Sequence, residues 1–273
     1  MKSELPAKPL FSVVIPTFNR PDMLVRAITS VMSQTCDDFE IIVVDDGSDV
    51  DVRVADHAGW GKKVIVIRSQ CNMGVAHARN TGIRQARGTY VSFLDDDDEF
   101  ATDFLEKTAA ALAYTPTSIG FSWTHVAYVC YSRFGGLTRR REFAGRYADD
   151  EDLLCDAAFI GTGFGVTIKR ACFERVGCFD ASLQFVEDTD FFVRLLAAGF
   201  RPVLVDTFGV RVHNHHMRRL TAPEHYPQRL IECDLLMKRH EVFINNHPRV
   251  LARFSESTEL IRRRMARRLE QGR

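Results

Sequence analysis

The sequence lacks three features that often assign a protein to a class: charge of one sign, paired cysteines and a long apolar run. It holds 36 Lys and Arg against 36 Asp and Glu. A main partner such as the phosphate backbone of nucleic acid would require a basic excess, so we expect no nucleic-acid binding. Seven cysteines, with no Cys-x-x-Cys pair, argue against a disulfide framework and a thiolate zinc site. The longest uncharged apolar run, residues 157–168, is too short to cross a bilayer.

The N-terminal residues 1–9 carry Lys2, Glu4 and Lys8 and contain no apolar stretch of signal-peptide length. We therefore expect a cytoplasmic protein. Apolar residues make up 45% of the chain and charged residues 26%, which is typical of a globular protein. A length of 273 residues predicts one large domain, alone or with a short appendage.

The first half of the chain alternates between β-rich runs and segments with helical spacing. Helical segments of this length between strands imply crossover connections and an open, mostly parallel α/β sheet of the Rossmann-like type, flanked by helices. The predicted strands are residues 11–15, 40–44, 63–67 and 89–94, and the predicted helices are residues 23–34 and 74–87.

From residue 119 the regular alternation of predicted strands and helices ends. We predict short strands at residues 119–123, 127–131, 202–205 and 210–212, and a helix at 189–198. Residues 133–146 hold five arginines around two glycines and read as an exposed loop. From residue 249 the chain carries eight Arg against three Glu, with apolar side chains at 254, 261, 265 and 269 near one helical face.

This pattern predicts a main domain over residues 1–228 and a helical C-terminal extension over residues 229–273. Within the main domain, the change in pattern separates a first half, about residues 10–115, from a second half, about residues 116–228.

Polar residues follow three of the predicted strands. Pro16–Arg20 follows the first strand, Asp45–Ser48 the second and Asp95–Asp98 the fourth. Ligands of open α/β sheets bind beyond the carboxyl ends of the strands, so we expect these three segments to form one shared site.

The run of four aspartates is the strongest single signal for a site. In an extended segment Asp95 and Asp97 face one way and Asp96 and Asp98 the other. A hard divalent cation would offset their repulsion, and Mg²⁺ is usually bound by one or two carboxylates together with substrate phosphates. The alternative is a solvated acidic turn, which the position at the end of a buried strand makes less favourable.

Two further segments carry candidate residues, each with a structural alternative. Glu187 and Asp188 precede the helix at 189–198, where they could supply a general base or only favour the positive end of the helix. His213 lies in the segment Val212–His216, and a late histidine can ligate a metal, although isolated histidines are usually surface or core residues. We chose His213 over His215 and His216.

Three stretches of the chain resemble family 2 glycosyltransferases with the GT-A fold. They are SVVIPTFNRPDMLVRAITSVMSQTCDDFEIIVVDDGS, NMGVAHARNTGIRQARGTYVSFLDDDD and RVGCFDASLQFVEDTDFFVRLLAAGF, in the order and spacing of that family over most of residues 11–200. The resemblance implies an inverting transferase that uses a nucleotide-sugar donor and Mn²⁺ or Mg²⁺. It also implies that the half at about residues 10–115 binds the nucleotide and the half at about residues 116–228 binds the acceptor.

The resemblance also assigns roles residue by residue. It places Asp46 against the base, Arg79 on the nucleotide side of the cleft, Asp97 on the metal and Asp188 as catalytic base. Because Asp96 and Asp98 are also acidic, the choice among the four carboxylates stays open. The full predicted set is Thr17, Arg20, Asp46, Arg79, Asp95 and Asp96 for the nucleotide sugar, Asp97, Asp95 and His213 for the metal, Glu187 on the acceptor side and Asp188 for catalysis.

The predicted function is transfer of a sugar, preferably from a UDP-linked donor, to a hydroxyl of a saccharide or lipid-linked saccharide in cell-surface polysaccharide synthesis. The basic tail predicts peripheral contact with anionic membrane at its inner face, and Arg139–Arg141 contact with an anionic acceptor. The alternatives are a nucleotidyltransferase and a non-catalytic sugar-binding relative. Residues 16–22 lack the glycine-rich loop of the former, and intact Asp97 and Asp188 argue against the latter.

Overall fold

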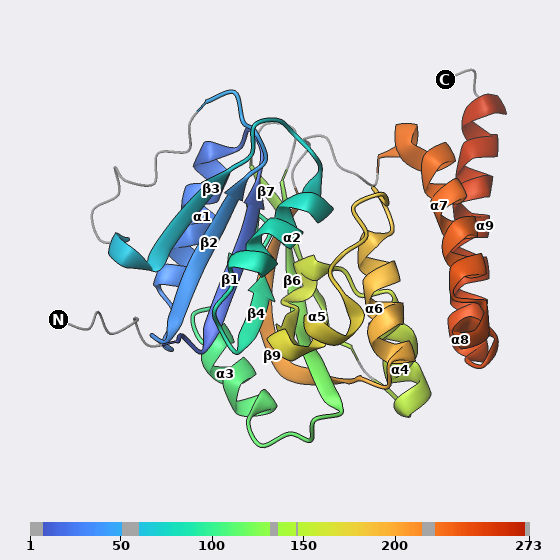
Figure 1. Cartoon of the computed structure of the whole chain (residues 1–273). Helices are drawn as coiled ribbons and strands as arrows, with labels where there is room; N and C mark the ends of the chain where they lie inside the picture. The colour runs from blue at the N-terminus through green and yellow to red at the C-terminus, as the bar shows by residue number, and fades with distance from the viewer. Residues whose placement is uncertain (1–7, 51–59, 132–135, 146, 215–221, 271–273) are drawn as a thin grey trace.

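The computed structural model describes residues 8–50, 60–131, 136–145, 147–214 and 222–270, so most of the N-terminal segment used to exclude a signal peptide lies outside it. Figure 1 shows a twisted sheet with helices on both faces and a group of helices at the far end, near the C-terminus. The helices are α1 (Pro21–Met32), α2 (Val75–Gln85), α3 (Phe104–Leu112), α4 (Asp150–Ala158), α5 (Arg170–Val176), α6 (Glu187–Ala197), α7 (Tyr226–Arg239), α8 (Glu241–Asn245) and α9 (Pro248–Glu270).

The strands form one sheet in the order β3-β2-β1-β4-β8-β6-β9-β5, with β7 paired to β6. Strands β1 to β4 are mutually parallel. Because β4 and β6 are both antiparallel to β8, and β9 is parallel to β6, the carboxyl ends of these longer strands point the same way. The strands are β1 (Phe11–Thr17), β2 (Phe39–Asp45), β3 (Val64–Arg68), β4 (Tyr90–Phe93), β5 (Glu99–Phe100), β6 (Ile119–Tyr131), β7 (Leu137–Phe143), β8 (Thr167–Lys169) and β9 (Arg201–Asn214).

The central strands and α1 follow directly from their apolar pattern. All seven residues of β1 and of β2 are buried, as expected for parallel strands covered on both faces. Helix α1 begins with Pro21, which has no N–H to leave unpaired in the first turn. Its buried residues recur at three- and four-residue intervals, which places one stripe against the sheet: Leu24, Ala27, Ile28 and Val31.

Two hydrophobic clusters cover the two faces of the sheet. One contains side chains of α1 and α3. The other contains side chains of α2, α4, α5 and α6 and extends to Val250 and Phe254 of α9. The predicted α/β fold with a helical C-terminal region is therefore confirmed, and α9 is part of the core.

Two pairs of predicted short strands are wrong, because each pair is one long strand. The segments at 119–123 and 127–131 form β6, and those at 202–205 and 210–212 form β9. The pairing register between β6 and β9 shifts near Thr124 and His125. The residues between the two predicted segments of β9 therefore form bulges, and the strand continues through them. A Cβ on Gly209 would lie 2.6 Å from Thr124, and this close approach explains the glycine.

The predicted exposed loop at 133–146 is also wrong in part. Residues 137–143 form β7, which pairs antiparallel with β6 along Val126–Tyr131. Every residue of β7 is exposed, so the exposure was predicted correctly but the strand was not. Residues 132–135 and 146 lie outside the described part of the chain.

The C-terminal helix has the predicted apolar face. Phe254 and Ile261 are buried and Met265 is half-buried, whereas the side chain of Leu269 is not described. Arg249 and Arg253 pair with acidic residues of α4, which fixes α9 against the main domain. Within the described ranges, no helix combines the length and the apolar character that a bilayer span requires.

Candidate active site

Three strand ends meet at the carboxyl edge of the sheet, as predicted. The backbone N–H of Asp46 donates to the carbonyl of Thr17, over 2.9 Å. The Thr17 hydroxyl donates to Asp96 Oδ2 over 2.7 Å, and Arg20 Nη1 donates to Asp96 Oδ1 over 3.0 Å. The ends of β1, β2 and β4 are therefore joined by direct hydrogen bonds.

The acidic run divides differently from the predicted alternation. Asp95, Asp97 and Asp98 each place a carboxylate oxygen within 4.8 Å of the others, while Asp96 turns to Thr17 and Arg20. The expectation that Asp98 faces the same way as Asp96 is wrong. The run forms a turn, closed by the Asp98 N–H donating to the Asp95 carbonyl over 3.1 Å, so side chains do not alternate.

Burial and mutual repulsion make the acidic run costly to ionise. Burial raises the pKa of Asp96 to about 6, although the charge of Arg20 and the Thr17 hydrogen bond oppose the shift. Burial and the neighbouring carboxylates also raise the pKa of Asp95 and, more strongly, of Asp98. The site therefore holds more negative charge than its nearby cations neutralise.

The oxygen set formed by Asp95, Asp97 and Asp98 fits a divalent cation. Mg²⁺ and Mn²⁺ prefer carboxylate and water oxygens, and a cation at this point would relieve the repulsion that raises these pKa values. Arg20 Nη1 lies 3.1 Å from Asp97 Oδ2, and Arg26 donates to the Asp97 carbonyl over 2.6 Å. Helix α1 thus holds the turn from the other side.

His213 lies beside the acidic run. Its backbone N–H donates to Asp98 Oδ1 over 2.9 Å. Its ring nitrogens contact Glu99 Oε2 at 2.5 Å and the Tyr131 hydroxyl at 2.6 Å. His213 is thus within the site, with both ring nitrogens engaged by protein groups, and its role as a metal ligand stays a prediction. His215 and His216 lie outside the described residues.

Arg79 joins the acidic run to the acidic pair at the start of α6. Its Nη1 lies 3.0 Å from Glu187 Oε1 and 3.2 Å from Asp188 Oδ1, and its Nη2 lies 3.2 Å from Asp95 Oδ1. Burial alone would lower the pKa of this guanidinium, but the three carboxylates outweigh burial and raise it. One buried cation therefore fixes two candidate functional groups at adjacent positions.

The two members of the acidic pair differ in access. Glu187 is buried, and burial together with the charge of Asp188 raises its pKa. The Asp188 side chain is 22% exposed, and its Oδ2 accepts from the Thr162 N–H over 3.1 Å. Asp188 is thus the carboxylate that a bound molecule can reach. The contact from Thr162, in the short helix η2 (Thr162–Phe164), was not predicted, because no motif links it to α6.

Asp46 is buried and anchors the loop before α2. Its carboxylate accepts the backbone N–H groups of Met73 and Gly74, over 2.7 to 3.1 Å. Gly74 has φ +93°, a conformation that favours glycine, and stands at the N-terminus of α2. The arrangement keeps Asp46 beside Thr17 at the edge of the sheet, and its contact with a base stays a prediction.

A second buried acidic centre lies on the same helix as Asp188. Asp190 is fully buried and accepts from Arg194 Nε over 2.8 Å and Arg239 Nη1 over 2.9 Å, with His240 Nε2 also at 2.9 Å. Burial would raise the pKa of Asp190, but the His240 hydrogen bond and the arginines outweigh it and lower this pKa. Asp190 therefore ties α6 to the end of α7.

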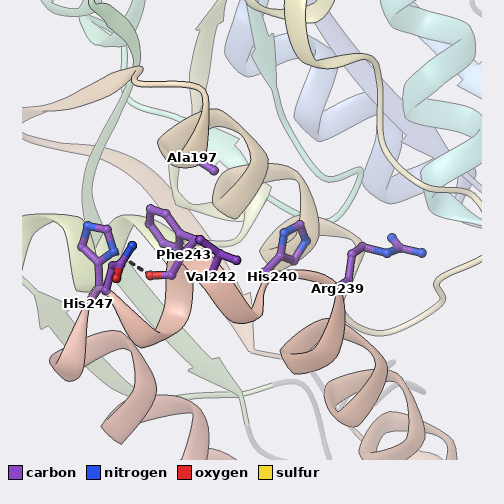
Figure 2. A pocket seen from close by; sticks show the side chains of 7 residues that line it. Ala197, Arg239, His240, Val242, Phe243 and His247 are labelled. Carbon is purple, nitrogen blue, oxygen red and sulfur yellow. Dashed lines mark hydrogen bonds between the residues drawn. The ribbon is translucent and has the colours of Figure 1, made fainter.

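A cavity of about 320 Å³ lies beside this second centre, away from the acidic run. Figure 2 shows its wall, in which the side chains of Arg239 and His240 come from the end of α7 and the turn that follows it, and Phe243 and His247 from the next turns. Ala197 of α6 completes it. Its Arg239 and His240 side chains already contact Asp190, so we assign the candidate site to the carboxyl edge of the sheet.

A family model described as glycosyl transferase family 2 matches residues 12–177. The chain belongs to this family. An uncharacterized glycosyltransferase of Haemophilus influenzae is 30% identical over 191 residues, covering 68% of this chain and 62% of that protein. The putative teichuronic acid biosynthesis glycosyltransferase TuaG of Bacillus subtilis is 37% identical over 102 residues, 37% of this chain and 40% of that protein.

Solved structures of this kind share the fold. The structure of S. aureus TarS 1–349 in complex with UDP-GlcNAc matches with a TM-score of 0.61 at 18% identity, covering 83% of this chain and 66% of that one. GalNAc-T7 with UDP, GalNAc and Mn²⁺ matches with a TM-score of 0.59 at 18% identity, covering 77% and 44%. The chain spans less than two thirds of the length of each of these four proteins.

Proposed function

We propose that this family 2 protein is an inverting, metal-dependent glycosyltransferase. It moves a sugar from a nucleoside diphosphate, with UDP preferred, to a hydroxyl of a saccharide or lipid-linked saccharide acceptor. The reaction belongs to the synthesis of cell-surface polysaccharide in the cytoplasm, close to the inner face of the membrane.

One observation carries this proposal: the site holds two separate sets of carboxylates, joined by Arg79. Asp95, Asp97 and Asp98 form a cluster that fits a divalent cation. Asp188 stands apart on α6, partly exposed and held by Arg79 and Thr162. Transfer with inversion needs this division, because the leaving diphosphate and the acceptor hydroxyl lie on opposite sides of the reacting carbon.

In this mechanism Asp188 takes the proton of the acceptor hydroxyl as the hydroxyl attacks. Arg79 donates to its Oδ1 and the Thr162 N–H to its Oδ2, and these two contacts orient the carboxylate. Asp97, with Asp95, would hold Mn²⁺ or Mg²⁺, which supplies a Lewis acid for the charge on the leaving diphosphate. Glu187 lies beneath Asp188 and completes the acceptor side.

The preference for UDP and Mn²⁺ rests on similar proteins and on the residues of the sheet edge. TarS has been crystallised with UDP-GlcNAc, and GalNAc-T7 with UDP and Mn²⁺. In the present chain Thr17, Arg20 and Asp46 stand together next to the acidic run, where the nucleoside would lie. Asp96 holds Thr17 and Arg20 in this arrangement and would lie near the ribose.

The membrane contact rests on α9. Its outer surface carries Arg264 and Arg267, which are exposed and form no ion pair with any described residue. Basic residues near an anionic surface contribute about 1 kcal/mol each. Changing both to Glu should reduce co-sedimentation with anionic vesicles, whereas Arg201→Glu, at the start of β9, should leave it unchanged. Equal binding by all three proteins would contradict this part of the proposal.

The test of the whole proposal is a binding and turnover experiment on the full chain. UDP should raise the thermal midpoint only when Mn²⁺ is present, because a ligand that prefers the native state stabilises it. Donor hydrolysis or transfer should stop in EDTA and return with Mn²⁺. Asp97→Asn should abolish both effects. Asp37→Asn, an exposed carboxylate at the start of β2, is the matched control and should change neither. Full turnover in EDTA would contradict the proposal.

A further inference from the structure

Among the residues that the structure describes, strand β7 carries three adjacent arginines without an ion pair. Arg139, Arg140 and Arg141 are exposed, and none forms an ion pair with a residue of the described chain. By contrast, Arg249 and Arg253 of α9 are neutralised by α4. Unpaired arginines close to a catalytic centre require an explanation other than fold stability.

The backbone of β7 determines which of these arginines share a face. The strand is regular from residue 139 to residue 143, and its one irregularity lies opposite Cys130 and Tyr131. Side chains alternate along a regular strand, so Arg139, Arg141 and Phe143 lie on one face and Arg140 on the other. Arg139 is four residues from Phe143, which corresponds to about 13 Å along the strand.

Phe143 shows that this face begins at the candidate site. Its ring packs edge-on against Phe164, with the ring centres 6.1 Å apart. Phe164 belongs to η2, in which Thr162 donates to Asp188. In the same turn a Cβ on Gly163 would lie 3.2 Å from Asp95 Oδ2. Arg141 and Arg139 therefore extend outward from the segment that holds the proposed base.

We propose that Arg139 and Arg141 form a subsite for a phosphate or diphosphate group of the acceptor. The proposal rests on the proposed function, because it names the class of molecule whose hydroxyl Asp188 would deprotonate. Guanidinium groups form paired, charge-assisted hydrogen bonds with phosphate oxygens. Two of them on successive positions of one strand face match a group with two negative charges.

Protection of an edge strand is an alternative role for the three arginines of β7, and it predicts a different effect of substitution. Charged side chains on an edge strand also prevent pairing with another chain, and for that purpose both faces of β7 are equivalent. A phosphate subsite requires Arg139 and Arg141 specifically, whereas edge protection requires only charge. Arg140 is therefore the matched control, since it has the same charge, strand and exposure but the opposite face.

The test is calorimetric titration of the full chain with inorganic pyrophosphate in EDTA. Without a cation the acidic run repels the probe, so binding reports on other sites. We expect Arg139→Ala combined with Arg141→Ala to weaken binding at least tenfold, and Arg140→Ala to leave it within about twofold. No binding by the unaltered chain, or an equal loss in all variants, would overturn the proposal.

Two further probes distinguish the source of the phosphate. A lipid carrier predicts that farnesyl diphosphate binds more tightly than pyrophosphate, and a phosphate-linked polymer predicts this of a short glycerol phosphate oligomer. In both cases the double variant must lose the binding. Because no donor or metal is present, the result is independent of the UDP and Mn²⁺ experiment, so each proposal can fail alone.

Discussion

Helix α6 connects two buried acidic centres that differ in their balance of charge. At its first turn Glu187 and Asp188 share a single guanidinium, that of Arg79, with Asp95. Two residues later the single carboxylate of Asp190 contacts two arginines and a histidine, and one of these arginines, Arg239, also contacts Asp180. Three carboxylates thus share one guanidinium at the first centre, whereas one buried carboxylate accepts from two guanidiniums at the second.

The pKa values of the two centres shift in opposite directions. Burial is the largest cause of the raised pKa values of Asp95, Asp96, Asp98 and Glu187, and the nearby arginines do not reverse it. At Asp190 the His240 hydrogen bond and the arginines outweigh burial and lower the pKa. A centre with uncompensated negative charge lowers stability until a cation binds, whereas a neutralised one adds stability without a ligand. The comparison separates a site kept for binding from one kept for structure, although both are buried and acidic.

The largest expected effect is on turnover at the first centre. Asp188→Asn should reduce turnover by about 10² to 10⁴-fold, because Asn cannot accept the acceptor's proton. Affinity for UDP with Mn²⁺ should barely change. The measurement is paired, transfer to acceptor and calorimetry of the nucleotide. Near-normal turnover would move the role to another carboxylate, with Glu187→Gln tested next, and loss of both quantities would indicate a folding defect.

The next effect is on stability at the second centre. Asp190→Asn should lower the free energy of unfolding by about 3 kcal/mol, because it removes the buried charge to which Arg194 and Arg239 donate. Urea unfolding gives the value. Asp98→Asn, at the first centre, should be neutral or stabilising when Mn²⁺ is absent. If the two variants lost equal stability, the distinction between the centres would be wrong.

A divalent cation should offset the loss of stability that the buried carboxylates of the first centre cause. Mn²⁺ at one hundred times its dissociation constant should stabilise the chain by about 2.7 kcal/mol. The gain should disappear in Asp97→Asn and persist in Asp190→Asn, when each is compared with its own metal-free state. Retention of the gain in Asp97→Asn would place the cation elsewhere.

The smallest effect is the pH dependence in EDTA. The folded chain binds a proton at Asp96 more tightly than the unfolded chain does, since its pKa is raised to about 6. Asp96 alone should therefore add about 1 kcal/mol of stability as the pH falls from about 8 to about 5, and the raised pKa values of Asp95, Asp98 and Glu187 act in the same sense. Below about pH 4 the lowered pKa of Asp190 acts in the opposite sense, and stability should fall. Asp96→Asn should flatten the upper part of the curve, and an unchanged curve would contradict this assignment.

The sequence predicted the parts of the fold that depend on local pattern. The buried runs of β1 and β2 and the spacing of α1 placed those elements within two residues. Strand β7 was missed because its arginines have no apolar alternation, and only its pairing with β6 makes it a strand. The interruption in β9 looked like a turn because bulges depend on the neighbouring strand.

The candidate site was predicted as a set of residues but not as a network. The acidic run and the pair at Glu187 and Asp188 stand out in the sequence, and they do lie close together. The link through Arg79, which is 108 residues from Glu187, depends on the tertiary fold. Asp190 was predicted only as part of a helix, because two of its three partners, Arg239 and His240, lie far along the chain.

The contacts of Arg239 and His240 with Asp190 affect the order in which the elements of the protein fold during synthesis. A ribosome finishes residues 1–230 before it supplies either side chain. The growing chain then already contains every proposed catalytic carboxylate, yet Asp190 has only Arg194 of its own helix as a charged partner among those that it contacts in the folded chain. Helix α6 gains its contacts with Arg239 and His240 only when α7 has emerged and folded back, so we expect the proposed base to reach its final position after residues 239 and 240 are made.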